Sequence, residues 1–347
     1  MKKIYKLFIF SFLFLFLIIS ASCSKTNNNE FASWNECDSL TSLKSYVEDV
    51  TNEKSKNFIP KEARIATFDM DGTLYGELFP AYFEYLLFCH RVLDDKDYTG
   101  ADEEMIETAT LIRNNKYTWA MTQPGIELGH ARGQAKAFAG MNETEFVEYV
   151  QEFAKTKAEG FNNLTYADAT YKPMIEVVNY LQKNDFKTYV VSGSDRFICR
   201  AVASIPFNIP YNQIIGMDAT IVGEDQGDTD GLNYQLSLDE EVLRGDQLLI
   251  KNLKMNKVVA ITKEIGIQPV LAFGNSSGDI SMLNYAMSNP KYKGQGYMLI
   301  ADDEARDYVN MEETNKRKAN WEKNNYHIIS MKNDFKTIYG ENVTKIS

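Results

Sequence analysis

The sequence predicts an α/β protein: a parallel sheet flanked by helices, with an inserted α-helical cap and a β-hairpin extension. Three apolar runs end in polar turns that contain glycine, at 65–75, 186–194 and 269–279, which is typical of buried strands in open α/β sheets. About a hundred residues separate the first two runs, more than a crossover helix needs. A chain of 347 residues with 44% hydrophobic content can hold one large domain with such an insertion.

The amino terminus predicts an export signal over 1–22. A basic start, the apolar run 7–19 and a small-residue exit are typical of a secretory signal peptide. Cys23 then resembles the cysteine of a bacterial lipobox, which implies a lipid anchor in the cell envelope, facing the periplasm or the cell surface. Ser20 stands where an aliphatic residue is usual, so cleavage to a soluble protein is the alternative. A polar tether and an amino-terminal helix are expected over 23–58.

Two carboxylates one residue apart, Asp69 and Asp71, follow the first run and precede Gly72-Thr73. At the carboxyl end of a strand they repel each other, so the fold must supply a cation, a shared proton or a basic neighbour. Mg²⁺ fits best, because it is a hard ion that prefers oxygen ligands. Asp69 could then act as nucleophile and Asp71 as proton donor in phosphoryl transfer. An acidic turn that caps a helix is the alternative interpretation.

With this strand and its Asp-x-Asp-Gly-Thr, the chain resembles the haloacid dehalogenase-like hydrolase superfamily, whose core is a Rossmann-like parallel sheet flanked by helices. The resemblance covers roughly residues 60–340. It implies that Asp69 attacks phosphorus, and that Asp71 protonates the leaving group and then activates water. It also implies that Thr73 contacts the substrate, and that Asp69 and the backbone carbonyl of Asp71 are Mg²⁺ ligands.

The second and third motifs of the superfamily can be placed on 186–194 and on a downstream lysine. In family terms Ser192 and the Gly193 amide hold phosphoryl oxygens, with Ser194 beside them; an ordinary helix N-cap is the alternative. The third motif is a lysine at a helix start that neutralises nucleophile and phosphate. Lys257 is the choice, and the alternatives are Lys251, Lys254 and Lys263.

The fourth motif is Gly-Asn-Ser-Ser-Gly-Asp at 274–279. Asn275 replaces the usual first aspartate, and Asp279 matches the second. The pattern resembles the phosphoserine phosphatase-like branch, so Asn275 is interpreted as a variant Mg²⁺ ligand whose amide oxygen adds no charge. Asp279 is expected to serve the metal, by holding a metal-bound water or by orienting Lys257.

The insertion over 76–169 resembles the helical cap of that branch. Helical periodicity covers 83–93, 103–114 and 143–157. A cap over the strand ends would exclude water from the nucleophile and select the leaving group.

The rest of the chain, 59–75 and 170–347, is expected to form the core domain. Within it, 173–184 should be a helix that leads into the second-motif strand. Alternating apolar residues over 212–249, with a turn rich in Gly and Asp, predict a β-hairpin before Lys257.

The motifs specify a reaction and leave the alcohol of the substrate open. Arg132, with His130, could bind the distal end of the substrate, or both could lie in a solvated cap turn. Arg196 leaves the same choice. Asp302 and Asp303 could cap the helix that follows them or line the site rim. Aromatic residues near the first motif could cage a quaternary ammonium group or form the core of the cap: Tyr75, Phe79, Tyr82, Phe83 and Tyr85.

Composition argues against two classes of site. The net charge of -11, without any prominent basic cluster, argues against a nucleic-acid surface. Zinc is not expected, because the three histidines are isolated in the sequence: His90, His130 and His327. If Cys23 carries lipid, an odd set of cysteines remains, and at least one is unpaired in an oxidising compartment: Cys37, Cys89 and Cys199.

Three function classes follow. The first is a Mg²⁺-dependent phosphomonoester hydrolase that acts through an aspartyl-phosphate on a small phosphorylated metabolite in the envelope. The second is another enzyme on this fold, such as a phosphotransferase, a dehalogenase or a phosphonatase; Asp71 favours hydrolysis, because by resemblance dehalogenases lack it. The third is a substrate-binding surface lipoprotein on a catalytically weak scaffold, for which Asn275 is the one indication.

Overall fold

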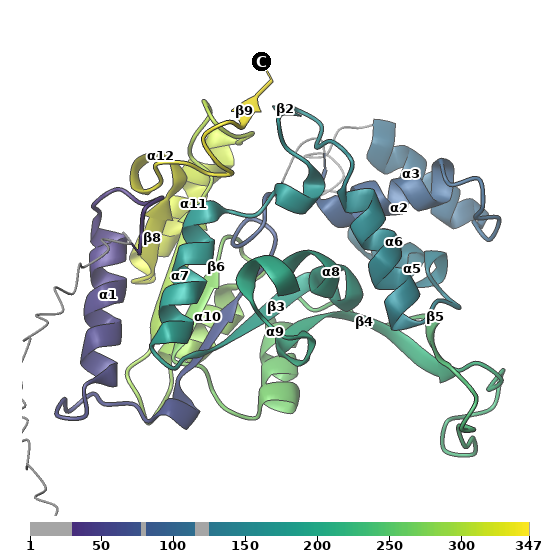
Figure 1. Ribbon diagram of the computed structural model, residues 1–347, viewed down its shortest axis with the longest axis horizontal. Coiled ribbons are helices and arrows are strands. Elements are labelled where there is room, and N and C mark those ends of the chain that lie inside the picture. Colours follow the sequence, from purple (N-terminus) through teal and green to yellow (C-terminus); the bar gives the residue numbers. More distant parts are fainter. Residues whose placement is uncertain (1–29, 78–80, 115–124, 347) are drawn as a thin grey trace, which may run out of the picture.

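The computed structural model describes residues 30–77, 81–114 and 125–346 (Figure 1). The predicted signal peptide, Cys23 and most of the predicted tether lie outside the described residues. Within the described ranges, no helix combines the length and the apolar character that a bilayer span requires.

A seven-stranded sheet forms the centre of the molecule, in the order β5-β4-β3-β1-β6-β7-β8. Neighbouring strands are parallel, except that β4 and β5 pair antiparallel as a hairpin that extends the sheet. The predicted fold class, with its hairpin extension, is confirmed. The strands are β1 (Ile65–Phe68), β3 (Lys187–Asp195), β4 (Ile214–Gly223), β5 (Val242–Ile250), β6 (Leu271–Gly274), β7 (Gln295–Ile300) and β8 (His327–Ser330).

Helices cover both faces of the sheet, because successive strand residues point to opposite sides. Val190 and Phe68 belong to one apolar cluster, with α1, α7 and α8, whereas Val191 and Ala272 belong to a second, with α9, α10 and α11. Burial on both faces explains the apolar strand runs. These helices are α1 (Asp38–Thr51), α7 (Lys172–Lys183), α8 (Arg196–Phe207), α9 (Met255–Ala260), α10 (Ile280–Met287) and α11 (Met311–Lys323).

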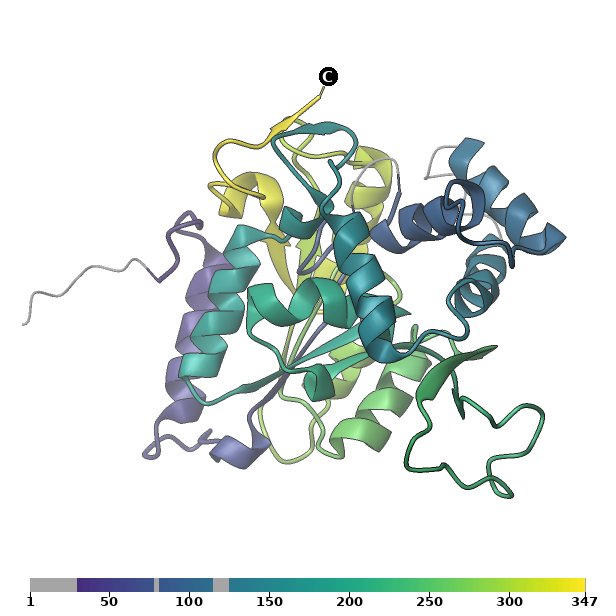
Figure 2. The ribbon, with the colours of Figure 1, turned by 45° about the vertical axis from the view of Figure 1, so that its right-hand side comes forward.

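Four further helices, called the cap helices below, gather on one side of the sheet (Figure 2). They are α2 (Phe83–Leu93), α3 (Glu103–Asn114), α5 (Ile126–Ala137) and α6 (Glu143–Ala154). The predicted helices 83–93 and 103–114 match the structure. The third stops short of 157, because Thr156 N–H closes a turn on the Phe153 carbonyl at 3.0 Å. The interpretation of 129–134 as a turn is wrong, since these residues lie inside α5.

The start of α6 shows why the sequence forms a helix there. The Asn142 side chain accepts the Glu145 N–H at 2.9 Å, and Glu145 accepts the Asn142 N–H at 3.0 Å, which completes a capping box. Phe146 and Val150 on the next turns are fully buried, as their spacing predicts. The division of the chain into a cap over 76–169 and a core stays a prediction.

The described amino-terminal residues, from residue 30 on, pack against α7. Trp34 Nε1 donates to the Pro173 carbonyl at 2.9 Å, and the Phe31 and Tyr180 rings lie 5.1 Å apart. Phe335, near the carboxyl terminus, packs on Trp34 with the ring centroids 4.9 Å apart.

The remaining elements are short. They are α12 (Met331–Asp334), the paired strands β2 (Phe161–Asn162) and β9 (Thr344–Lys345), single 3₁₀ turns at 61–63, 166–168 and 211–213, and a π turn (Ile261–Ile265) that extends α9. Three cysteines are free in the described chain: Cys37, Cys89 and Cys199.

Candidate active site

The register of the central strands brings three of the predicted motifs to one edge of the sheet. Phe68 in β1 pairs with Val190 in β3 and with Phe273 in β6. Asp69 directly follows Phe68, and its N–H donates to the Phe273 carbonyl at 2.9 Å. The turns after β1, β3 and β6 therefore meet at the carboxyl edge, where open α/β sheets bind ligands.

The turn after Asp69 is held by its own backbone. The N–H groups of Thr73, Leu74 and Tyr75 converge on the Met70 carbonyl at 3.2, 2.8 and 2.9 Å. Gly72 has a φ of 81°, and a Cβ there would lie 1.8 Å from Asn275 Nδ2. Glycine is required at this position both by the left-handed backbone and by the close approach of the fourth motif.

Lys257 lies between two carboxylates, 2.5 Å from Asp69 Oδ1 and 2.7 Å from Asp279 Oδ1. Its side chain is fully buried. Burial lowers the pKa of Lys257, but attraction to Asp279 and Asp69 outweighs it and raises the pKa overall, so the ammonium stays charged. The alternatives Lys254 and Lys263 are exposed.

Asp69 is 6% exposed, and its environment opposes ionisation. Burial, followed by repulsion from Asp279, raises the pKa of Asp69 to about 7, although Lys257 acts in the opposite direction. Thr73 Oγ1 donates to Asp69 Oδ2 over 3.4 Å, a long hydrogen bond. Oδ2 is therefore the less committed oxygen of this carboxylate.

Asp71 has one satisfied oxygen and one unsatisfied oxygen. Ser194 Oγ donates to Asp71 Oδ2 at 2.6 Å, whereas Oδ1 is buried without a hydrogen-bond partner among the described residues. Burial, and then the charge of Asp69, raise the pKa of Asp71 well above its usual range. The protonated form is favoured, which suits a group that donates a proton.

The residues of the second motif continue β3 and do not form an N-cap. Ser192 is fully buried, its Oγ accepts the Ser194 N–H at 3.0 Å, and its carbonyl accepts from Asn252 Nδ2 at 2.9 Å. Gly193 follows it in the same strand. The cap of α8 is Asp195, which accepts the Phe197 N–H at 2.9 Å, so the N-cap interpretation of the serines is wrong.

The fourth motif shows different roles for its two polar residues. Asp279 Oδ2 accepts the N–H groups of Asn275 and Ser276 and the Ser276 hydroxyl, at 3.0 to 3.1 Å, while Oδ1 accepts Lys257. Both oxygens are occupied by the protein, and Asp279 orients Lys257. Asn275 Nδ2 donates to Glu77 Oε1 at 2.6 Å, and the amide oxygen of Asn275 accepts no hydrogen bond from the residues that the structure describes.

Several predicted residues lie apart from this pocket. Arg132 is exposed on α5. Arg196 binds Asp218 at 2.7 Å and Glu264 at 2.7 Å, so it links β4 to the end of the π turn. Asp302 and Asp303 do not cap the helix that follows them, because α11 begins later, at Met311. Asp302 accepts the Ser330 hydroxyl at 2.6 Å and the Lys332 N–H, in the first turn of α12, at 2.9 Å, and Asp303 accepts two N–H groups of the next turn.

The aromatic residues near the first motif form core contacts. Tyr75 and Phe83 are buried with ring centroids 5.9 Å apart, and Tyr75 donates its hydroxyl to the Tyr166 carbonyl at 2.5 Å. Tyr85 is also buried, with its ring 3.9 Å from His130. Phe79 lies outside the described residues. The contacts favour the cap-core interpretation over a cage.

The site contains oxygen donors of the kind that Mg²⁺ prefers. Among the described residues, no group of three His, Cys, Asp or Glu side chains is arranged to hold a metal ion. Mg²⁺ needs fewer, because it accepts carbonyl and amide oxygens and keeps several waters. Asp69 Oδ2, the Asp71 carbonyl and the amide oxygen of Asn275 fit that requirement, and Glu77 orients the amide.

Sequence reasoning missed Glu77 and Glu84. Glu84, in α2, is buried and accepts from Lys251 Nζ at 3.1 Å and from the Asp195 N–H at 3.2 Å. Its position between two aromatic residues was the available signal, since a carboxylate in an apolar helix face needs a partner.

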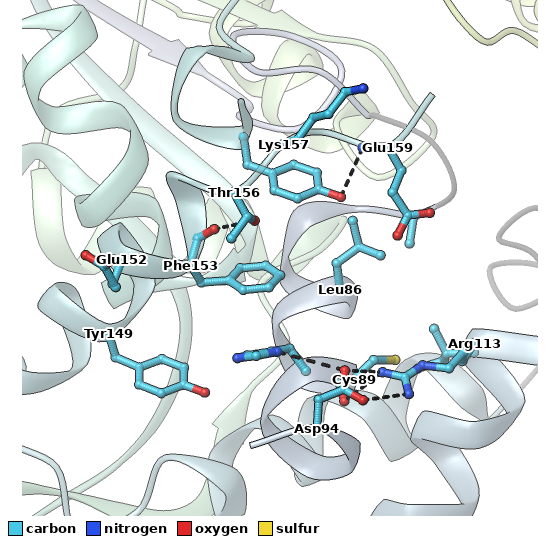
Figure 3. Close-up of a pocket in the computed structure, with 14 residues that line it drawn as sticks. Leu86, Cys89, Asp94, Arg113, Tyr149, Glu152, Phe153, Thr156, Lys157 and Glu159 are labelled. Carbon is cyan, nitrogen blue, oxygen red and sulfur yellow. Dashed lines mark hydrogen bonds and ion pairs between the residues drawn. The ribbon is translucent and has the colours of Figure 1, made fainter. Parts of the chain in front are cut away.

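A separate pocket lies among the cap helices (Figure 3). It has a volume of about 760 Å³ and is lined by residues of α2, α3 and α6 together with Thr156, Lys157 and Glu159. Asp94 and Arg113 lie side by side in its lining and form an ion pair at 2.6 Å. None of the predicted site residues lines this pocket.

Comparisons with known proteins agree with this geometry. A family profile described as haloacid dehalogenase-like hydrolase matches residues 66–284, more than half of the chain. No curated protein sequence matches the chain. Among solved structures, a protein of unknown function from Anaerococcus prevotii has a TM-score of 0.52 at 14% identity, covering 87% of this chain and 94% of that one. This likeness shows the fold alone.

Two other solved structures are similar at lower scores. A protein of unknown function from Bordetella pertussis has a TM-score of 0.48 at 13% identity, covering 77% of this chain and 97% of that one. Cytosolic 5'-nucleotidase IIIB, bound to cytidine, has a TM-score of 0.49 at 12% identity, covering 83% of each chain.

Proposed function

The chain belongs to the haloacid dehalogenase-like hydrolase family, and from that premise we propose that it is a Mg²⁺-dependent phosphomonoester hydrolase that acts through an aspartyl-phosphate. The observation that carries the proposal is the buried set of Asp69, Asp71 and Lys257. One carboxylate has an uncommitted oxygen, a second favours its protonated form, and an ammonium group stands beside the first.

The first chemical step uses Asp69 and Asp71. An Asp69 carboxylate oxygen forms a bond to phosphorus while the bond from phosphorus to the alcohol oxygen breaks. Asp71 gives its proton to that oxygen, so the alcohol leaves neutral. Lys257 favours the ionised form of Asp69, against the effect of burial, and offsets the charge of the phosphoryl group.

The second step hydrolyses the aspartyl-phosphate. Asp71, now ionised, takes a proton from a water molecule that attacks phosphorus, and the bond to Asp69 breaks to release inorganic phosphate. Ser194 keeps the Asp71 carboxyl in place through both steps. Mg²⁺ would be held by Asp69, the Asp71 carbonyl and Asn275, and when bound it neutralises and orients the phosphoryl oxygens.

The proposal includes the phosphoserine phosphatase-like branch and a small phosphorylated substrate. The cap helices between β1 and β3 and the Gly-Asn-Ser-x-Gly-Asp turn support that branch. Thr73, Ser192 and the Gly193 amide lie at the carboxyl edge beside Asp69 and are proposed to contact phosphoryl oxygens. Ser194 and Arg132 are less suited to contact the substrate, because Ser194 binds Asp71 and Arg132 is exposed.

Phosphate release from an aryl phosphate, with and without Mg²⁺, tests the reaction. Wild-type protein should release phosphate in the presence of Mg²⁺, and Asp69→Asn should lose turnover by at least about a thousandfold, because an amide cannot attack phosphorus. Asp246→Asn, at an exposed position, is the matched control and should behave as wild type. Near-normal activity of Asp69→Asn would overturn the nucleophile assignment.

We further propose that the enzyme is anchored to the envelope membrane through lipid on Cys23. The support is the order of basic, apolar and small residues before that cysteine. Wild-type protein should enter the detergent phase, and Cys23→Ala should move it to the soluble fraction. A soluble mature protein with an unmodified terminus downstream of Cys23 would refute the anchor.

A further inference from the structure

A second buried polar group of residues lies where the cap helices meet the carboxyl edge of the sheet. It is called the cap–core cluster here and consists of Glu84, His130, Gln134, Lys251 and Asn252. Glu84 joins the two sides: its Oε2 accepts the Asp195 N–H at 3.2 Å, and its Oε1 lies 4.0 Å from His130 Nδ1.

The cluster borders the pocket that holds the nucleophile. Asp195 directly follows Ser194, whose hydroxyl binds Asp71, and Asn252 donates to the carbonyl of Ser192. The charge of Glu84 also contributes to the raised pKa of Asp71. A leaving group expelled toward Asp71 therefore departs on the side where the cap–core cluster lies.

The charged groups of the cluster and its border are already paired. Lys251 Nζ binds Glu84 Oε1 at 3.1 Å, and Arg244 forms an ion pair with Asp195. Burial, and then the charge of Lys251, hold the pKa of His130 well below its usual value, so the ring is neutral. The region thus offers a ligand no unbalanced charge of either sign.

Its neutral groups, by contrast, lack partners. Four buried atoms of the cluster have no hydrogen-bond partner within the described chain: His130 Nδ1, Gln134 Oε1, Gln134 Nε2 and Asn252 Oδ1. All three side chains are 0% exposed, and Gln134 follows His130 by one turn of α5. Native proteins rarely leave buried amides unpaired, so each such group calls for a missing partner.

The unpaired atoms are mostly acceptors. His130 Nε2 faces the Glu84 carbonyl at 3.4 Å, so the ring proton belongs there and Nδ1 accepts. The two amide oxygens also accept, and Gln134 Nε2 donates. A ligand that satisfies them must donate hydrogen bonds and accept one in return, and a hydroxyl group does both.

Resting on the proposed function, we infer that the preferred substrates are phosphomonoesters of neutral, hydroxyl-bearing alcohols, such as polyols and sugars, whose hydroxyls bind His130, Gln134 and Asn252. A cationic alcohol would need a free carboxylate, and Glu84 is taken by Lys251. A second phosphate would need a cation without a counter-ion, whereas the charge of Arg244 is balanced by Asp195, although the Arg244 Nε–H has no partner among the described residues.

A substrate series on the full chain tests the inference. Glycerol phosphate and a hexose monophosphate should exceed phosphoethanolamine, phosphocholine and a sugar bisphosphate by at least about tenfold in kcat/KM, since mismatched polar groups are strongly rejected. Preference for either cationic ester or for the bisphosphate would overturn it. If even the aryl phosphate is not hydrolysed with Mg²⁺, the proposed function itself fails, which is a separate outcome.

Gln134→Leu and Gln134→Met separate ligand binding from a structural role. Both should lower the ratio of kcat/KM for glycerol phosphate to that for the aryl phosphate by roughly ten- to a hundredfold. Their melting temperatures should equal or exceed that of wild type, because an unpaired buried amide is removed.

Gln182→Leu is the matched control. Gln182 is half-buried on α7, away from the site, and its Nε2 donates to Thr188 Oγ1 at 3.0 Å and to the Phe207 carbonyl at 3.1 Å. This variant should lower the melting temperature and leave the substrate ratio unchanged. An unchanged ratio in both Gln134 variants would show that Gln134 contacts water and not substrate, and would refute its role.

Discussion

Two buried polar regions meet near Asp71, and they differ in how their charges are balanced. The nucleophile pocket, formed by Asp69, Asp71, Lys257 and Asp279, holds three carboxyl groups against one ammonium. The cap–core cluster pairs its charges and leaves amide and imidazole atoms unpaired. An excess of carboxylate attracts a cation and the anion that the cation carries, whereas unpaired neutral groups attract neutral polar ligands. In the two proposals, the reaction and the selection of substrate are therefore separated in space.

Substitution of the lysine in each region gives the strongest test of this difference in charge balance. Lys257→Met should lower the free energy of unfolding at pH 7 by about 3–5 kcal/mol, because it strands two buried carboxylates, and should abolish activity. Lys251→Met should cost roughly half as much, since this lysine serves Glu84 alone. Urea unfolding of both variants measures the difference, with Lys263→Met at an exposed position as control. Equal losses would mean that the two regions do not differ in charge balance.

Asp71→Asn tests the boundary between the regions. The amide keeps a hydrogen bond with Ser194 but cannot transfer a proton, so kcat should fall by about 10²–10⁴-fold. Single-turnover experiments with an aryl phosphate should show a build-up of aspartyl-phosphate, because the water-activating base is lost. An activity above a tenth of wild type would place the acid elsewhere, with Glu84 as the next carboxylate.

The charge excess of the nucleophile pocket should appear as pH-dependent stability in metal-free protein. The folded pKa of Asp69, about 7, lies above the unfolded value of about 4, so the folded state binds the proton more tightly. The protonated Asp69 therefore adds to the free energy of unfolding below pH 4, and this stabilisation is lost as the pH rises through 7. Melting temperatures of wild type should therefore fall over this window relative to Asp69→Asn, which does not titrate there. Parallel profiles would contradict the pKa shift.

The smallest effect concerns Asn275 and the strength of Mg²⁺ binding. Asn275→Asp should tighten Mg²⁺ binding, so that activity saturates at a lower Mg²⁺ concentration, because it adds a negative ligand. Asp279→Asn should weaken Mg²⁺ binding and lower the rate, each by roughly ten- to a hundredfold, because it releases Lys257 and the turn at 275–276. Mg²⁺ titrations of the three proteins check both. If neither variant changes the titration, the turn is structural only.

Much of the nucleophile pocket could be predicted because its signals are local. The strand, the turn and both carboxylates of the first motif lie within eleven residues, and the same strand-then-turn pattern recurs before Ser192 and Asn275. The geometry then places Lys257 rather than its exposed neighbours beside Asp69. The position of Asp279 follows from the same turn.

The cap–core cluster could not be predicted, because it depends on contacts between distant segments. Glu84 and Lys251 are separated by 167 residues, and Asn252 and Ser192 by 60. The helix α5 was also missed, since Gly129 and Gly133 suggest a turn. In the structure a Cβ at Gly133 would lie 2.7 Å from Phe88, so that glycine permits close packing of α5 on α2.

The ion pair between Asp69 and Lys257 also sets an order of assembly. The two residues are separated by 188 positions, and Lys257 follows the whole cap and the β4–β5 hairpin in the chain. A chain synthesised from its amino terminus presents the acidic turn long before the lysine that neutralises it exists. Contacts of such long range close late in folding. The proposed catalytic site is therefore completed as one of the final events of biogenesis, and in a chain truncated before α9 the charge of Asp69 lacks its counter-ion.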